Sequence, residues 1–175
     1  MLQLVNHLDA SYNLAKWLTQ NEHDAEDVVQ DAYVRAIRHF GSFHGGEGKA
    51  WLLAIVRNLC YDSMRRKGVR ERTASFDEEV HNKCVTTADP EATLLQKERA
   101  GLLRQALGEL PVELREVLVL RELDELSYRE IASIARVPIG TVMSRLSRAR
   151  RRLQTVLLPP KHVGEAASQD TPAAR

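Results

Sequence analysis

The stretch from Ser127 to Leu153 constrains this chain more than any other, because it predicts two short helices joined by a tight turn. Ser127 and Glu130 form an S-x-x-E capping box, in which each side chain accepts a hydrogen bond from the other residue's backbone N–H. The turn is expected at Arg136-Val137, and Pro138 suits the first position of the next helix, where no backbone N–H is needed. A helix-turn-helix has this arrangement and presents its second helix to the major groove of DNA.

The second predicted helix separates an apolar face from a basic one. Apolar residues recur at positions 142, 146, 149 and 153, and no acid occurs between Ile139 and Leu153. A basic helix face can be no more than solvated surface. Here, however, all the charge has one sign and no acid four residues away balances it, which favours contact with nucleic acid. The residues expected away from the apolar face are Thr141, Ser144, Arg145, Arg148, Arg151 and Arg152.

Composition favours an all-α fold. Leu, Ala, Arg and Glu dominate the chain, and the Asn-Gly or Asp-Gly pairs typical of tight hairpins do not occur. The formal net charge is only +1, but the charges are segregated along the sequence. Residues 22–31 contain five acids and neither Lys nor Arg, whereas the predicted recognition helix has the opposite bias. Such segregation indicates separate faces for separate partners.

Several functional classes find no support. Cys60 and Cys84 do not form a C-x-x-C pair, so neither a disulfide framework nor a zinc site is predicted, and His81 with Cys84 offers too few ligands for a metal. The glycine-rich stretch 41–50 fails the phosphate-loop pattern, because Phe43 and Ala50 occupy positions that need Gly and Ser or Thr. No catalytic arrangement is evident, so we expect neither an enzyme nor a cofactor.

The sequence also predicts a cytoplasmic protein without a membrane segment. Its N-terminus lacks the basic region followed by an apolar stretch that marks a signal peptide. The longest apolar run, from Trp51 to Val56, is far too short to span a bilayer.

Two amphipathic helices are predicted at the start of the chain. The first extends from Leu4 to Leu18, and Asp24 is the expected N-cap of the second. The acids of the second helix lie in its first turns and outside its apolar stripe. They either complement the helix dipole alone or form a docking face for a basic partner, and the residues by themselves leave both open. The expected inner stripe is Val29, Ala32, Tyr33, Ala36, Ile37 and Phe40.

A third predicted helix covers residues 51–68 and combines a core face with a basic, partly aromatic face. Trp51, Leu52, Ile55 and Leu59 form the expected core face. The other face suits a nucleic-acid backbone and unstacked bases, although a solvated helix end with arginines near its C-terminus is the alternative. That face carries Arg57, Asn58, Tyr61, Asp62, Arg65 and Arg66.

Helical periodicity disappears after residue 66, which predicts two small helical domains joined by a flexible linker. The predicted boundaries are a first domain over residues 1–66, a linker over 67–90, a second domain of about four helices over 91–158, and a disordered tail over 159–175. The helix-turn-helix lies in the second domain.

The two predicted helical domains resemble those of bacterial RNA polymerase sigma factors of the extracytoplasmic-function (ECF) type. The resemblance covers roughly residues 5–66 and 94–153 in the order and spacing of that family. It is carried by DAEDVVQDAY, by AWLLAIVRNLCYDSMRR, and by LPVELREVLVLRELDELSYREIASIARVPIGTVMSRLSRARRRL.

This resemblance implies a promoter-recognition protein whose partners are core RNA polymerase, promoter DNA and an anti-sigma factor, with no obligate homo-oligomer. Docking on the clamp helices of the largest polymerase subunit would fall to Asp24, Glu26, Asp27, Gln30 and Asp31. The −10 element would be captured by the loop 40–49 and the third helix, through Phe43, His44, Lys49, Arg57, Asn58, Asp62, Arg65 and Arg66. The −35 element would be read by Arg136, Pro138, Gly140, Thr141, Ser144, Arg145, Arg148, Arg151 and Arg152.

Two departures from the family pattern qualify these expectations. Met143 stands where the family commonly has Lys or Arg, which removes one expected phosphate contact, and the −10 loop is unusually rich in glycine. The alternative function is a stand-alone helix-turn-helix regulator, which explains the arginines but leaves the acidic helix and the first domain without a role.

Overall fold

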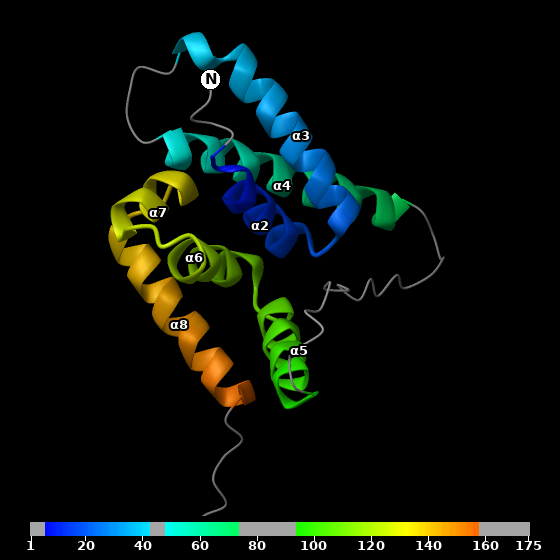
Figure 1. The fold of residues 1–175 in the computed structure, drawn as a ribbon, viewed down its shortest axis with the longest axis vertical. Coiled ribbons are helices and arrows are strands. Elements are labelled where there is room, and N and C mark those ends of the chain that lie inside the picture. Colours follow the sequence, from blue (N-terminus) through cyan, green and yellow to red (C-terminus); the bar gives the residue numbers. More distant parts are fainter. Residues whose placement is uncertain (1–5, 43–47, 74–93, 158–175) are drawn as a thin grey trace, which may run out of the picture.

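The computed structural model describes residues 6–42, 48–73 and 94–157, without the side chains at 42, 70–73 and 94–99. Every regular element in these ranges is helical, which confirms the all-α prediction (Figure 1). The elements are α2 (Leu8–Thr19), α3 (Glu22–Arg38), the 3-10 turn η1 (Phe40–Ser42), α4 (Gly48–Thr73), α5 (Leu94–Gly108), α6 (Val112–Glu122), α7 (Tyr128–Ala135) and α8 (Ile139–Leu157).

The first half of the chain is a unit of three helices, α2, α3 and α4, that pack on one another. The N-cap of α3 is Asn21, whose side chain accepts a hydrogen bond of 3.1 Å from the backbone N–H of Asp24. The prediction of Asp24 as N-cap was therefore wrong: the N-cap lies three residues earlier, α3 begins at Glu22, and Asp24 lies in its first turn.

The buried stripe of α3 also differs from the predicted one at its C-terminal end. Val29, Ala32 and Ala36 are buried as expected, but Ile37 is 49% exposed and Phe40 42% exposed. Ala25 and Val28 are buried instead, at the other end of the helix. The stripe thus contacts α2 and α4 mainly through the first part of α3, and the last turn extends past the core (Figure 1).

Helix α4 is longer than predicted, because it continues through Thr73. Residues 67–73, assigned to the linker from the sequence, are helical, and the rest of that segment through residue 90 lies outside the described residues, as do the predicted tail and Cys84. Leu52, Leu53, Val56, Leu59 and Cys60 form the buried side of α4.

The second half of the chain contains α5, α6 and the helix-turn-helix formed by α7 and α8. Helix α6 is buried along nearly its whole length, from Leu114 to Leu120, and packs on both α7 and α8. Helix α5 contacts α8 but leaves Leu102 and Leu103 exposed.

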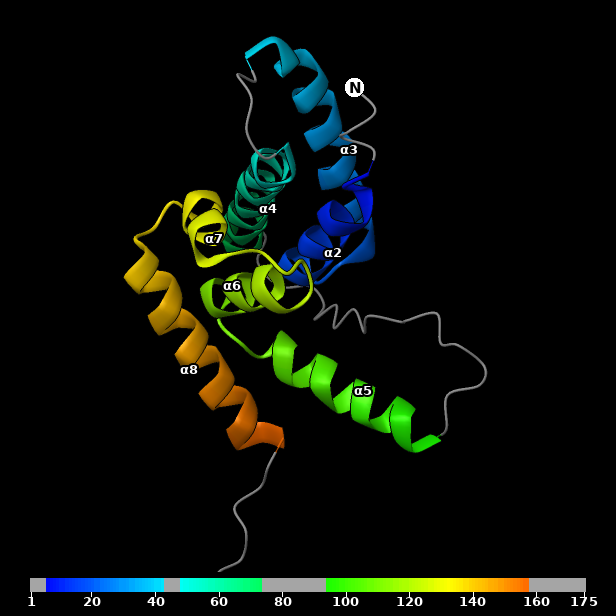
Figure 2. The ribbon, with the colours of Figure 1, turned by 60° about the vertical axis from the view of Figure 1, so that its left-hand side comes forward.

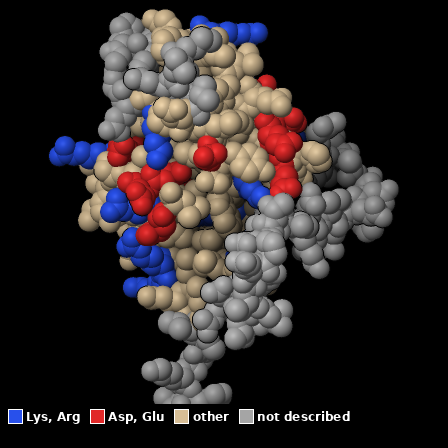
Figure 3. Space-filling view, in the orientation of Figure 1, with Lys and Arg blue, Asp and Glu red and all other residues tan. Residues whose placement is uncertain are grey.

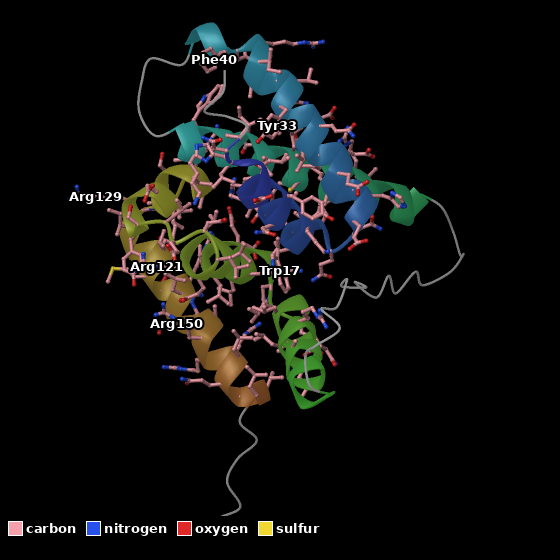
Figure 4. The ribbon with its side chains drawn as sticks, in the orientation of Figure 1. Trp17, Tyr33, Phe40, Arg121, Arg129 and Arg150 are labelled. Carbon is pink, nitrogen blue, oxygen red and sulfur yellow. The ribbon has the colours of Figure 1, made fainter. Side chains whose placement is uncertain are left out.

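The two halves pack directly on each other. Helix α4 lies along α7, and α2 lies along α6, so that one cluster of buried apolar residues includes members from both halves (Figure 2). Trp17 of α2 points toward α6 within this seam (Figure 4). No helix in the described ranges is both long and apolar enough to cross a membrane.

Candidate nucleic-acid interface

The helix-turn-helix has the local geometry that the sequence predicts. The backbone N–H of Ser127 donates to Glu130 Oε2 at 2.6 Å, and the N–H of Glu130 donates to Ser127 Oγ at 3.3 Å, which completes the capping box. Arg136 ends α7 in the left-handed conformation, with φ of 54°. Pro138 lies just before α8 and not at its first position, and its carbonyl oxygen accepts from Thr141 at 2.9 Å.

Helix α8 buries one face and exposes the opposite one. Val142, Leu146 and Ala149 are buried, and Leu153 is partly buried against the same core. Thr141 and Arg145 are half-buried, and Arg145 Nη1 is enclosed without a hydrogen-bond partner. The other members of the predicted −35 set are exposed, namely Arg136, Pro138, Gly140, Ser144, Arg148, Arg151 and Arg152.

Side chains on the outer face of α8 are held by short-range hydrogen bonds. Ser144 Oγ donates to the carbonyl oxygen of Thr141 at 3.0 Å, and Arg148 donates to both the carbonyl oxygen and Oγ of Ser144 at 3.3 Å. These contacts hold the Arg148 guanidinium over the first turns of the helix, which is the part of a recognition helix that faces base edges.

Two further arginines lie beside this face and were missed from the sequence. Arg129 of α7 and Arg150 of α8 are both exposed and point away from the body of the protein on the same side (Figure 4). Arg150 forms an ion pair of 2.7 Å with Glu122 at the end of α6. A search confined to the second helix overlooks Arg129, which lies in the first turn of α7.

The acids of α3 form a separate surface at the opposite side of the molecule from α8 (Figure 3). Glu26, Asp27, Gln30 and Asp31 are exposed, whereas Asp24 is half-buried and forms an ion pair with Lys67 of α4. A groove of about 310 Å³ lies between α3 and α4, and its lining joins these acids to Arg66. The acidic face and the basic end of α4 are therefore neighbours.

The predicted −10 residues of α4 fall into two groups. Asn58 and Asp62 are half-buried, Arg65 and Arg66 are exposed, and Arg65 forms an ion pair with Asp62. Lys49 and Arg57 instead contact the second half of the chain. Lys49 Nζ donates to the backbone oxygen of Asp124 at 2.7 Å, and Arg57 Nε pairs with the carboxylate of Glu116. Phe43 and His44 lie outside the described residues.

Nothing in the described ranges groups three or more His, Cys, Asp or Glu side chains into a candidate metal site. Cys60 is buried and free, and burial, together with the nearby Glu116 carboxylate, raises the pKa of its thiol to about 12. Such a thiol is fully protonated near neutral pH and behaves as a small packing residue.

A helix-turn-helix with a basic outer face, combined with a three-helix unit that carries an acidic face, is the architecture of a DNA-binding transcription protein. Family models support this class: residues 4–70 match "Sigma-70 region 2" and residues 100–153 match "Sigma-70, region 4". The chain belongs to the ECF sigma factors of bacterial RNA polymerase.

Relatives support the same membership. The ECF sigma factor SigE of Mycolicibacterium smegmatis is 36% identical over 161 residues, which cover 92% of this chain and 62% of SigE. The chain thus spans less than two thirds of that relative. The ECF sigma-E factor of Escherichia coli K12 is 34% identical over 143 residues, 78% of this chain and 75% of the relative.

Solved structures share the fold. The sigma factor RpoE of Bartonella quintana, in complex with the anti-sigma factor NepR, matches with a TM-score of 0.76 and 34% identity, over 91% of this chain and 97% of that one. CnrH, in complex with the cytosolic domain of CnrY, matches with a TM-score of 0.63 and 26% identity, over 89% of this chain and 85% of CnrH.

Proposed function

We propose that this sigma factor recruits core RNA polymerase to promoters through three separate surfaces and acts by binding, not by catalysis. The observation that carries this proposal is the segregation of charge in the folded chain. Exposed carboxylates lie on the first turns of α3, whereas the exposed charged residues of α8 itself are all arginines. Figure 3 shows the α3 carboxylates at the upper right and basic residues at the lower left, with a second group of carboxylates beside the basic residues. Opposite charges on separate faces suit two partners of opposite charge.

The α7–α8 unit is our candidate for the −35 element. A buried stripe fixes α8 on the core, and the opposite face offers Ser144, Arg148, Arg151 and Arg152 to duplex DNA. Arginine suits this role because its planar guanidinium can donate two parallel hydrogen bonds to guanine or to phosphate. We add Arg129 to the predicted set, because it extends the exposed basic surface onto α7 (Figure 4).

The outer face of α3 is our candidate for polymerase docking, at the clamp helices of the largest subunit. Its exposed members are Glu26, Asp27, Gln30 and Asp31, and the groove against α4 gives this face a concave edge. Asp24 contributes from the first turn of α3 if its pairing with Lys67 is released.

The −10 element is assigned to α4 and the loop before it, where the exposed Arg65 and Arg66 stand beside the half-buried Asn58 and Asp62. We further propose that the chain has two domains, 1–66 for the −10 contact and 91–158 for the −35 contact. The segment between them would set the spacing of the two DNA contacts. The working place of such a factor is the cytoplasm, where polymerase acts.

A protein inhibitor is the third partner that we propose. Both structural relatives were solved as complexes, with NepR in one case and with the cytosolic domain of CnrY in the other. Because this chain matches them over most of its length, an anti-sigma factor of its own is a reasonable regulator.

Reconstitution with core polymerase tests the assignment. We expect specific binding of a promoter fragment, and transcription from it, only when both the chain and core polymerase are present. Replacing Arg148 and Arg152 with Ala should abolish protection of the −35 region while leaving polymerase association intact. Specific promoter binding by the chain alone, unaffected by polymerase, would instead identify a stand-alone regulator.

A further inference from the structure

Polar contacts tie the two halves of the chain together at the same place where the apolar core is shared. Gln20 Nε2, at the end of α2, donates to the backbone oxygen of Gly108 at 2.8 Å. Lys49 Nζ donates to the backbone oxygen of Asp124 at 2.7 Å. Each contact joins residues far apart in sequence, so each exists only while the halves are together.

Glu116 lies at the centre of this seam. Its side chain is 0% exposed, although its neighbours in α6 are mainly buried apolar residues. Both carboxylate oxygens are occupied from α4: Arg57 Nε donates to Oε1 and the Tyr61 hydroxyl donates to Oε2 at 2.8 Å. Arg57 also stacks over the Tyr61 ring, with 4.4 Å from its guanidinium carbon to the ring centroid.

A buried ion pair of this kind contributes little net stability, because desolvation of both charges offsets their attraction. It does, however, fix which surfaces may meet, since a mismatched surface would leave the carboxylate buried and unpaired. In the described residues, no side chain of the second half bonds to this carboxylate. When the halves separate, the Glu116 carboxylate loses both Arg57 and Tyr61 and depends on water or on a bound partner for its hydrogen bonds.

The seam also carries costs that separation would relieve. Arg115, next to Glu116, is 6% exposed, and its Nε and Nη1 have no hydrogen-bond partner. Asp124 Oδ2 is likewise buried without a partner. Unsatisfied buried polar groups oppose the closed arrangement. Glu116 therefore specifies the closed form, and these unsatisfied groups offset part of the stability that the shared apolar core contributes.

We propose that Glu116 is an internal latch that keeps the free sigma factor closed and takes Arg57 and Lys49 away from promoter DNA. This proposal rests on the assignment of Arg57 and Lys49 to the −10 contact. A guanidinium enclosed between Glu116 and Tyr61 cannot at the same time contact a DNA strand, so closure and full −10 contact exclude each other. A partner that binds the open form better, such as polymerase, shifts the population toward it.

The test uses the full-length chain and two variants of similar size, Glu116→Gln and Arg57→Gln. The radius of gyration from small-angle X-ray scattering reports opening. Fluorescence anisotropy with a labelled, sequence-randomised single-stranded DNA pool reports strand binding without polymerase. Both variants should enlarge the radius of gyration, because each breaks the latch from one side.

Strand binding should separate the two variants. Glu116→Gln frees Arg57 and should bind the pool about tenfold more tightly if the closed form predominates by about ten to one. Arg57→Gln opens the chain but removes the arginine, so it should gain clearly less. Glu113→Gln is the matched control, because it removes one exposed acid from the same helix and should change neither measurement.

An unchanged radius of gyration in Glu116→Gln overturns the latch. Opening without tighter strand binding keeps the latch but removes Arg57 from the −10 contact, which is a failure of the proposed function and not of the closed form. Circular dichroism verifies that each variant is folded. If Glu116→Gln does not fold, Tyr61→Phe removes only one hydrogen bond to the carboxylate and should open the chain partially, whereas a fully closed Tyr61→Phe overturns the latch.

Discussion

Lys49, at the beginning of α4, donates its hydrogen bond to the backbone oxygen of Asp124, a buried acid in the segment that connects α6 to α7. Asp124 is 5% exposed, and one oxygen of its carboxyl group has no partner. Burial raises the pKa of this carboxyl from 3.8 to about 6, and Lys49 lowers it by a smaller amount. The native state therefore holds this proton more tightly than the unfolded chain does.

Asp124 should make the protein less stable as pH rises from about 4 to about 6, with the full penalty present above pH 6. Asp124→Asn removes this titration. Between pH 4 and pH 7, the free energy of unfolding of the variant should improve relative to the wild type by roughly 1–3 kcal/mol. Urea denaturation of both proteins at pH 4 and at pH 7 measures this change. Any cost of burying the introduced amide that does not depend on pH cancels when the differences at the two pH values are compared. Glu125→Gln, at the exposed neighbour, is the control. A constant difference between variant and wild type would mean that Asp124 titrates normally.

The capping box should stabilise the helix-turn-helix measurably. Ser127→Ala leaves the N–H of Glu130 without its side-chain acceptor and should lower the free energy of unfolding by about 1 kcal/mol. Chemical denaturation gives this value. Ser133→Ala, at an exposed position within α7, matches the chemical change without touching the cap and should be nearly neutral. Equal effects of the two substitutions would show that the cap contributes nothing.

The helix-turn-helix was predictable because its determinants are local. A capping box, a turn and an apolar repeat all act within a few residues, and the structure reproduces them, apart from the place of Pro138 just before α8. The stripe of α3 was predicted less well. Periodicity marks an apolar face but does not reveal where a neighbouring helix ends, so Ile37 and Phe40 were assigned to a core that does not reach them.

The contacts of Arg57 could not be predicted from the sequence, because they depend on a residue that is distant along the chain. Its partner, Glu116, lies 59 positions away in an otherwise apolar helix. A charge inside such a run is a hint of a buried pair, but local spacing does not name the partner. The sequence therefore predicts that the whole polar face of α4 is exposed, whereas Arg57 and Tyr61 contact Glu116 of α6.

Asp27→Arg should weaken association with core polymerase while leaving the fold intact, because Asp27 is exposed on the outer face of α3. Reversal of one charge at a charged interface places like charges together and should slow association, most strongly at low salt. Surface plasmon resonance on immobilised core polymerase measures this effect. Asp9→Arg makes the same change at an exposed position of α2 and serves as the control. If both variants bind as the wild type does, the docking surface lies elsewhere.

Arg145 is the recognition residue whose role the structure makes most specific. It is half-buried, and its Nη1 is enclosed without a hydrogen-bond partner, so the side chain gains hydrogen bonds if it turns outward to meet DNA. Arg145→Ala should weaken promoter binding by the polymerase complex by about 1–3 kcal/mol and relax the preference at one position of the −35 element. Binding to a set of promoters with single substitutions in that element separates the two effects. Arg150→Ala is the matched control, because Arg150 lies on α8 like Arg145 but pairs with Glu122 of α6. Any effect of this substitution on binding should be the same for every promoter in the set. Uniform weakening by Arg145→Ala across the whole set would show that this side chain contacts phosphate and does not read a base.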